Sequence, residues 1–373
     1  MSFSSIVNEW SYTTFVFYLL IILICPIIVH LNKEKCIIFR IGNSKKRVPI
    51  GLMLSGAILI FIKGFGTAGY DIRNGYYLNF LTASSLDGIR DQNLEFLFKL
   101  LYVFTKHTFN EYWFFLLVIS VITVVPVLVI IWKYREKASM PLAMLVYLCL
   151  FYFNSFSAVR NYMAASIGLL VFDALYEKKK VKSLILIVIA TMVHSTMVAL
   201  LIPYICVFFK IIKKKYLIIG GGIIGFALLY VSREALIAQF SSIDRYSIYT
   251  GSVKVEFGFE QIVYYLPLFL LFLYGKKRYK DIGMDTLTLC YLVEGFALGM
   301  LGYVISIFAR FQTIMLPLLI IAPYYLRGVR IGKKNILKIL LIIYCVARFY
   351  IYMSQYYEIE GLMPYTNIFG WTI

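Results

Sequence analysis

The sequence predicts an all-helical protein that crosses a membrane many times. Of its 373 residues, 61% are hydrophobic and only 15% are charged, whereas a soluble domain carries about a quarter charged residues and about half apolar ones. The apolar residues are gathered in long runs, separated by short clusters of lysine and arginine. Because a span needs about 20 apolar residues, a chain of this length holds about ten transmembrane helices. We expect a single transmembrane domain over residues 1–373 and exclude a soluble enzyme.

Eleven apolar runs define the expected helices, with ends assigned to within a few residues. They span residues 12–31, 48–62, 112–132, 140–157, 158–176, 183–209, 216–231, 260–275, 285–305, 306–326 and 335–353. All of them except 183–209 are interpreted as single crossings.

Basic residues indicate the orientation, because loops rich in lysine and arginine stay in the cytoplasm. No lysine or arginine precedes the first run, and a basic stretch that includes Lys33, Arg40 and Arg47 follows it. This charge order is the reverse of that in a signal peptide, so we expect the N-terminus to lie outside and to be retained. Counting crossings from there places the C-terminus outside as well. The formal charge of +18 therefore reports topology, and no nucleic-acid partner is expected.

The run at 183–209 is flanked by basic clusters on both sides, EKKKVK before it and KIIKKK after it. A single crossing would place one cluster outside and invert every later loop. Its 27 residues are too few for two full crossings of about 20 residues each. We therefore predict two short or tilted helices, broken near Val193 to Thr196, that enter and leave on the same face. Broken helices occur in membranes where they are buried in protein or line a wet cavity.

Two outer segments are long enough to contribute to a site. The first, residues 63–111, contains LEFLFKLLYVF at 94–104, in which apolar residues recur at helical spacing. This piece predicts an amphipathic helix that lies along the membrane surface. The second outer segment is the loop at 232–259, which contains SSIDRYSIYTGS.

Charged side chains inside a bilayer are costly and are kept mainly where they pair or serve a site. Arg160 and Arg310 each begin a helix that runs inward from the outer boundary, and Arg348 lies near the outer end of the last span. Asn161 and several small residues follow Arg160, and small residues allow close helix packing. A buried guanidinium suits a phosphate or diphosphate. The alternative is that the arginine reaches the lipid headgroups, which we favour only for Arg348.

His194 lies deep in an apolar run, at the residues where the charge pattern predicts the helix break. A buried histidine is often a hydrogen-bonded core residue, but in a polar cavity it serves as a general base. Both interpretations stay open at this point.

Carboxylates, arginines and tyrosines in the outer segments are the side-chain types that contact carbohydrates, although each one alone is equally explained by solvation. They are Tyr70, Asp71, Arg73, Glu95, Arg245, Tyr246 and Tyr249. No nucleotide or metal motif is present, so neither a cofactor nor a metal site is expected.

Seven short motifs follow one another along the chain: YD..NGYY, LEFLF, VRNYMAASI, VHST, DRYSIYT, ARFQ and MPY. In this order the chain resembles the EpsG/Wzy-like family of bacterial polysaccharide polymerases. The resemblance implies a metal-independent glycosyltransferase with a GT-C-like scaffold at the outer face of the cytoplasmic (inner) membrane. The donor would be a glycan on undecaprenyl diphosphate, and the acceptor a lipid-linked repeat unit. A chain-length regulator of the pathway is a further expected partner.

On this hypothesis His194 is the base for the acceptor hydroxyl, and Asp71 or Glu95 is the alternative base. Arg160 and Arg310 bind the diphosphate, and Arg245, Tyr246 and Tyr249 belong to a sugar-facing loop. The further substrate-binding residues are Asn161, Tyr70 and Arg73.

Three other functions remain as alternatives. An O-antigen ligase would use the same donor but produce capped lipid core instead of a ladder of chain lengths. A lipid-linked oligosaccharide flippase would be expected to show two similar halves, which the sequence lacks. A small-solute transporter would carry charges along a pathway instead of at one face.

Overall fold

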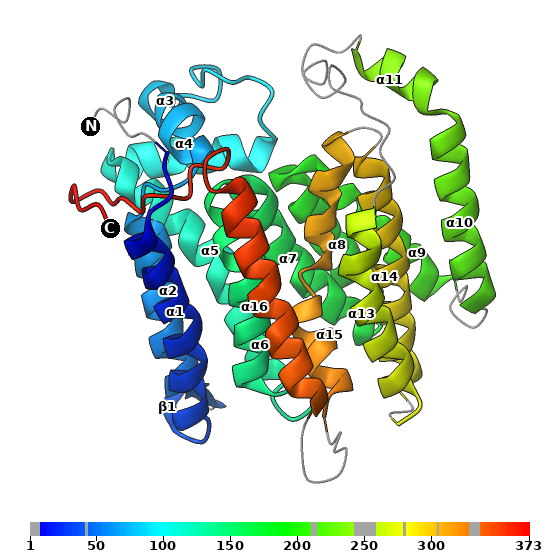
Figure 1. Cartoon of the computed structure of the whole chain (residues 1–373). Helices are drawn as coiled ribbons and strands as arrows, with labels where there is room; N and C mark the ends of the chain where they lie inside the picture. The colour runs from blue at the N-terminus through cyan, green and yellow to red at the C-terminus, as the bar shows by residue number, and fades with distance from the viewer. Residues whose placement is uncertain are drawn as a thin grey trace. The chain divides into compact units, whose positions relative to one another are not determined.

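A computed structural model describes residues 8–41, 44–209, 215–241, 259–278, 281–303, 306–327 and 336–373. This part of the chain is almost entirely helical (Figure 1). It divides into two compact units. Unit 1 comprises residues 1–166 and 326–373, and unit 2 comprises residues 167–325.

All eleven apolar runs coincide with helical structure, and eight of them are single α-helices. These are α1 (Tyr12–Leu31), α2 (Ile50–Phe65), α5 (Tyr112–Lys133), α7 (Val159–Tyr176), α10 (Lys215–Val231), α13 (Phe259–Lys276), α14 (Ile282–Gly302) and α16 (Ile336–Tyr356).

The run at 183–209 is broken where the charge pattern predicts. It consists of α8 (Lys180–Val193), the 3-10 helix η4 (Ser195–Leu200) and α9 (Leu201–Phe208), with the extended residue His194 between α8 and η4. That this segment returns to the face where it entered stays a prediction.

Two further runs are broken, and the sequence did not predict it. The run at 140–157 consists of α6 (Met140–Tyr147), the π-helix η2 (Leu148–Tyr152) and the 3-10 helix η3 (Phe153–Phe156).

The run at 306–326 was expected to be one continuous helix, and this expectation was wrong. It consists of the 3-10 helix η6 (Ser306–Met315) and the short helix α15 (Leu318–Tyr325). Pro317, which immediately precedes α15, lacks an N–H and has a fixed φ, and both properties suit the residue at which a helix begins. The run therefore restarts at this residue.

Four helices of the described ranges, α1, α5, α14 and α16, are long and apolar enough to cross a membrane. A fifth span results if the bent pair α10 and α11 (Arg233–Ser241) is counted as one. Shorter apolar helices cover Ile50–Phe65, Met140–Phe156 and Ser195–Phe208. The chain is thus a membrane protein with several spans, and the number of about ten remains a prediction.

In unit 1, α2 packs against α1 and α5, and small residues allow the close contact. An ideal Cβ on Gly64 of α2 would lie 3.0 Å from the Cα of Leu117 on α5. The Ser166 hydroxyl donates to the Thr123 carbonyl of α5 at 2.7 Å, which joins α7 to the same helix. The small residues after Arg160 therefore serve close packing, as the sequence predicts.

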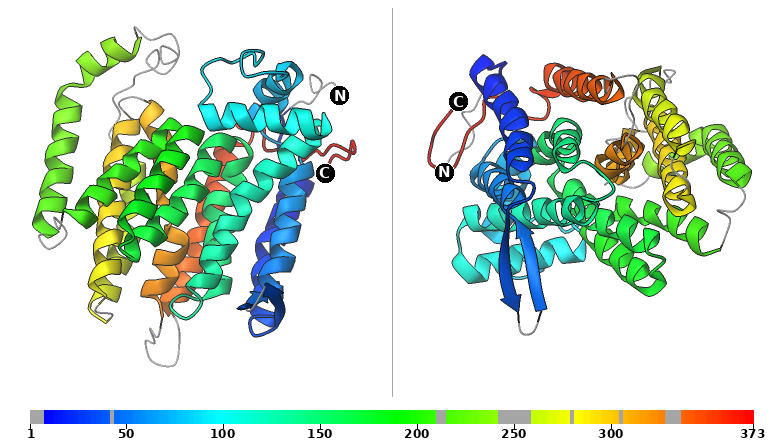
Figure 2. Two further views of the ribbon diagram at one scale, coloured as in Figure 1. Left: turned by 180° about the vertical axis from the view of Figure 1, so that it is seen from behind. Right: turned by 90° about the horizontal axis from the view of Figure 1, so that it is seen from below.

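Between α1 and α2 the chain forms an antiparallel hairpin, β1 (Cys36–Ile41) and β2 (Ser44–Pro49). These strands belong to the basic stretch that the charge pattern places in the cytoplasm, and the sequence did not predict them. The hairpin lies at one end of unit 1, and the start of α1 and the C-terminal segment lie at the other (Figure 1, Figure 2).

The C-terminal segment is held against the last residue of α2 and the first turn of α1. The Ile368 N–H donates to the Phe65 carbonyl at 2.9 Å, and the Thr14 hydroxyl donates to the Ile373 carbonyl. The start of α1, the C-terminal segment and residues 63–111 are thus on one side of unit 1, and the basic hairpin is on the other.

Arg73 ties these segments together from the π-helical turn η1 (Ile72–Tyr76). Its Nε donates to the Thr67 carbonyl, and its Nη1 donates to Asn8 Oδ1, both at 2.8 Å. Its Nη2 donates to the Pro364 carbonyl and the Thr366 hydroxyl, both at 3.2 Å. The side chain is 7% exposed, and burial lowers the pKa of Arg73 below its ordinary value.

We expect Arg73→Met to lower the free energy of unfolding by about 3 kcal/mol, because buried acceptors lose their donor. The measurement is the apparent Tm of the detergent-solubilised chain, taken as the loss of monodisperse protein on heating. Arg90→Met is the control, since Arg90 is an exposed arginine of the same segment, residues 63–111. Equal Tm values for the two variants would contradict the structural role of Arg73.

In unit 2, α14 is the central helix and packs against α9, α10, α13 and η6. The 3-10 helices η4 and η6 also contact each other. Since regular α-helix is the default inside a membrane, the meeting of two irregular segments marks this part of unit 2 as unusual.

Candidate functional site

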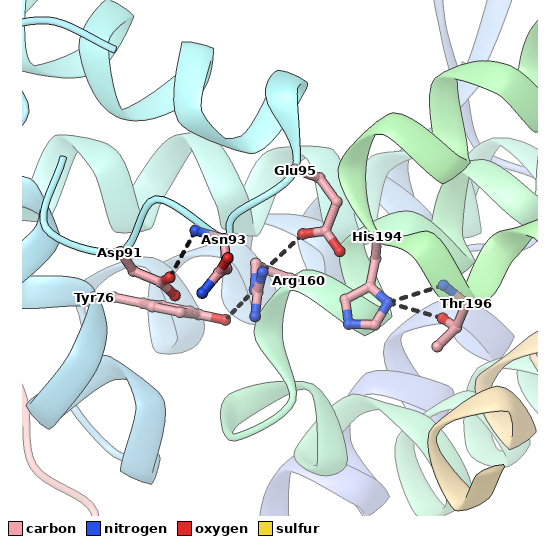
Figure 3. Close-up of polar contacts among 7 residues, drawn as sticks. All are labelled: Tyr76, Asp91, Asn93, Glu95, Arg160, His194 and Thr196. Atoms are coloured by element: carbon pink, nitrogen blue, oxygen red, sulfur yellow. Dashed lines mark hydrogen bonds and ion pairs between the residues drawn. The ribbon is translucent and has the colours of Figure 1, made fainter. Parts of the chain in front are cut away.

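Arg160, at the start of α7, forms an ion pair with Glu95 (Figure 3). Its Nη1 lies 2.7 Å from Glu95 Oε2, and the two side chains are 15% and 10% exposed. Its Nε donates to the Tyr76 hydroxyl at 3.3 Å, and its Cζ lies 5.7 Å from the centre of the Phe98 ring. The guanidinium is therefore held by charge, hydrogen bonding and an aromatic face within unit 1.

Glu95 is positioned as the residue before α4 (Phe96–Phe109), the helix that the sequence predicts at 94–104. Its backbone is extended, with φ −66° and ψ 148°, and its carbonyl accepts the Lys99 N–H at 3.0 Å. The helix is anchored on α5 by Tyr102, whose ring stacks on Phe115 at 4.2 Å. This packing holds the carboxylate of Glu95 toward Arg160.

The loop before Glu95 is ordered by polar contacts of its own. The Asn79 side chain accepts the Asp91 N–H at 3.0 Å, and Asp91 Oδ1 in turn accepts the Asn93 N–H at 3.0 Å (Figure 3). Asn79 lies on α3 (Tyr77–Thr82), so α3 holds the loop that precedes Glu95.

Asp71 and Tyr76 lie at the two ends of η1. The carboxylate of Asp71 lies close enough to Tyr76 and Arg160 for an electrostatic interaction with both. Burial, and then the charge of Asp71, raise the pKa of Tyr76 above its ordinary value. The Tyr76 hydroxyl therefore keeps its proton and is available as a donor. Single π-helical turns are frequent at functional sites.

Gly69 sets the start of this turn. Its φ is +112°, a conformation that side chains other than glycine rarely adopt. A Cβ at this position would overlap the Phe156 carbonyl oxygen, so the segment that carries Asp71 presses directly on the turn before α7. The backbone thereby brings Asp71 and Arg160, far apart in sequence, into one cluster.

The other predicted residues of unit 1 have different surroundings. The donors of Arg73 are directed at the protein's own acceptors, as described above, and Tyr70 is 54% exposed beside it. Asn161 is 4% exposed. Of the residues selected from unit 1, Arg160, Glu95 and Asp71 are therefore the ones that gather into a cluster.

In unit 2, His194 occupies the break between α8 and η4 and is 6% exposed. Its Nδ1 accepts the Thr196 N–H at 3.3 Å and lies 2.9 Å from the Thr196 hydroxyl (Figure 3). Because Nδ1 is the acceptor for a backbone N–H, the neutral ring carries its proton on Nε2. In this state His194 offers a hydrogen-bond donor.

Arg310 is an exposed residue of η6. Two positions along, Gln312 Nε2 donates to Gln261 Oε1 of α13 at 3.0 Å. Since η6 packs against η4, the segments that carry Arg310 and His194 adjoin within unit 2. The predicted sugar-facing residues Arg245, Tyr246 and Tyr249 lie outside the described residues.

Sequence reasoning missed two residues of the unit 1 cluster, Tyr76 and Phe98. Tyr76 belongs to the YD..NGYY motif, but 31 tyrosines in the chain hide the signal of any single one. In the described ranges, no three His, Cys, Asp or Glu residues are grouped as a metal site would require.

A comparison with protein families decides the affiliation, because the model of the EpsG family matches residues 50–367. The chain belongs to the EpsG family. The matched range includes the Arg160 cluster, His194 and Arg310. Membership of the EpsG family indicates a general role in polysaccharide polymerisation by a membrane protein. Comparison with curated proteins and with solved structures gives no significant match.

Proposed function

We propose that this EpsG-family chain polymerises lipid-linked oligosaccharide repeat units at the outer face of the bacterial inner membrane. The donor is a glycan on undecaprenyl diphosphate, and the acceptor is a lipid-linked repeat unit. The observation that carries the proposal is the largely buried Arg160, paired with Glu95 at 2.7 Å and joined by Tyr76 and Asp71. This cluster combines a fixed cation, two carboxylates and a proton donor, which are the groups that a glycosyl transfer from a diphosphate requires.

The proposed orientation follows from the two sides of unit 1. The basic hairpin lies on one side, and by the positive-inside rule this side is cytoplasmic. The chain ends, η1 and α4 are then outside, as is the Arg160 cluster. We keep about ten spans and a GT-C-like scaffold as parts of the proposal.

Arg160 acts on the leaving group. When the bond between the anomeric carbon and the diphosphate oxygen breaks, the electron pair stays on the diphosphate. A guanidinium already held in place stabilises the charge that develops there and needs no rearrangement at that moment. Its planar fork matches two phosphate oxygens, so this charge stabilisation requires no metal ion.

The base accepts the proton of the acceptor hydroxyl as that oxygen bonds to the anomeric carbon. Three candidates arise from the sequence: His194, Asp71 and Glu95. His194 presents a donor because its Nδ1 accepts the Thr196 N–H, and Glu95 is engaged with Arg160. These contacts favour Asp71 as the base, Glu95 as the residue that holds Arg160, and His194 with Arg310 as donors to sugar or diphosphate oxygens.

The test is the size distribution of surface glycan in a deletion strain and in the same strain complemented with the wild-type chain. We expect the deletion strain to lose the ladder of long chains and to retain single repeat units on the lipid, and complementation to restore the ladder. If the chain were a ligase, the deletion strain would instead contain long chains that are not attached to their acceptor. An unchanged ladder in the deletion strain would refute the proposed polymerase function.

A further inference from the structure

A buried lysine lies behind the Arg160 cluster and takes no part in the chemistry described so far. Lys63, near the end of α2, is 2% exposed. Its Nζ donates to the Ser155 carbonyl and lies 5.0 Å from the centre of the Phe156 ring. No carboxylate of the described ranges lies within 4.0 Å of it. A buried ammonium without a counter-ion is costly, so the groups that Lys63 contacts indicate its role.

The contacts of Lys63 are with the turn that precedes α7. Ser155 and Phe156 end η3, and α7 begins three residues after Phe156 and carries Arg160 in its first turn. Where a helix is interrupted, its carbonyls lack the usual backbone donors. Lys63 supplies such a donor to Ser155, so it holds the turn from which Arg160 projects.

A second contact from α2 holds the interrupted segment at Tyr152, the last residue of η2. The Tyr152 hydroxyl donates to the Leu59 carbonyl at 2.7 Å, and Leu59 lies one helical turn before Lys63. Both Tyr152 and Ser155 are buried. Of the two contacts, the one between Lys63 and Ser155 lies nearer to the start of α7 than the one between Leu59 and Tyr152.

The turn is also confined by the backbone at Gly69. Gly69, with φ +112°, lies so close to the Phe156 carbonyl that a Cβ would overlap it. Asp71 follows two residues later. Lys63 and Gly69 thus both fix the Ser155–Phe156 turn, from which the positions of Arg160 and Asp71 are set.

The geometry points to Lys63 as a positioning residue that holds Arg160, relative to Asp71, in the arrangement that binds the diphosphate. This inference rests on the proposed function, in which Arg160 contacts the leaving diphosphate. A displacement of about 1 Å in a catalytic group costs about a hundredfold in rate, so loss of the Lys63 contact acts on function even though Lys63 does not touch the substrate.

The experiment uses the full-length chain in detergent, with inorganic diphosphate as the probe. Binding is measured by calorimetric titration and Tm by heating, for the wild type, Lys63→Met, Tyr152→Phe and Arg160→Ala. Tyr152→Phe is the matched control, because it removes the other contact between α2 and the interrupted segment. We expect both Lys63→Met and Tyr152→Phe to lower the Tm. Only Lys63→Met is expected to weaken diphosphate binding, by about tenfold.

The outcomes separate this inference from the proposed function. Diphosphate binding that is lost in Arg160→Ala but unchanged in Lys63→Met, or weakened equally in Tyr152→Phe, overturns the positioning role alone. Absence of binding in the wild type, together with polymer synthesis by Arg160→Ala in cells, overturns both.

If Lys63→Met does not fold, Lys63→Arg provides the test. It keeps the charge and changes the geometry, so we expect a folded protein with diphosphate affinity reduced at least threefold, on the order of the loss of one well-placed contact. Wild-type affinity in Lys63→Arg overturns the positioning role.

Discussion

Asp71→Asn is expected to slow polymerisation by about 10²- to 10⁴-fold while the protein remains folded, because an amide cannot accept the proton of the acceptor hydroxyl. Asn has nearly the same shape as Asp and keeps the local hydrogen-bonding capacity of the π-helical turn. The loss is therefore expected in the chemical step and not in the amount of folded protein in the membrane.

The measurement is the initial rate of chain elongation by solubilised protein, with lipid-linked repeat units extracted from the deletion strain as substrate. Asp91→Asn is the matched control, since Asp91 is a carboxylate of the same segment, residues 63–111. Its Oδ1 accepts the Asn93 N–H, a role that an amide oxygen can also fill. We expect its rate to be that of the wild type.

The same assay decides between the candidate bases. His194→Ala is expected to retain more activity than Asp71→Asn, because His194 serves as a donor and its loss removes one hydrogen bond, a factor of about ten. Full activity in Asp71→Asn, with a large loss in His194→Ala, would transfer the role of base to His194. A large loss in Glu95→Gln alone would transfer it to Glu95.

Arg160→Ala is expected to abolish the long glycan ladder and to reduce elongation by about 10²- to 10³-fold, the loss typical of removing a fixed group that stabilises developing charge. Arg160→Lys is expected to recover little, because an ammonium cannot contact two oxygens in the planar geometry of a guanidinium. The readouts are the glycan ladder in cells and the elongation rate in the solubilised assay.

Arg348→Ala is the control for Arg160→Ala, since both arginines are predicted at the outer boundary of a span and Arg348 is assigned to the lipid headgroups. We expect its ladder to be unchanged. A full-length ladder in Arg160→Ala, at normal membrane expression, would remove Arg160 from the site.

A double-mutant cycle tests the role given to Glu95. If Glu95 acts by holding Arg160 through their 2.7 Å contact, Glu95→Gln slows elongation in the wild type but adds little in the Arg160→Ala background. Independent, additive losses would mean that Glu95 contacts the substrate directly.

Part of the candidate site was predictable residue by residue. Arg160 was identified because a charge in an apolar run is costly, and Asp71 and Glu95 because carboxylates in an outer segment suit sugar chemistry. None of these arguments brings the three together. Their convergence depends on Gly69 pressing against Phe156 and on α4 packing against α5, contacts between residues that are distant in sequence.

Lys63 was missed and Arg73 was assigned differently because their contacts are with residues distant in sequence. Lys63 ends an apolar run, where a lysine is the ordinary sign of a membrane boundary, and its burial against Ser155 depends on the interrupted helix before α7. Arg73 was selected as a substrate ligand, yet its donors contact Thr67, Asn8, Pro364 and Thr366.

The sequence by itself determined where the helical segments lie, because each must bury a run of apolar side chains. It also indicated where one of them is broken, because the basic clusters at both ends of 183–209 predict a segment that returns to the same face. Only the tertiary structure decided the interruptions at η2, η3 and η6 and the cluster around Arg160. Hydropathy reports the composition of a segment, whereas the backbone hydrogen bonding within it and the partners of its charged groups depend on which helices pack against it.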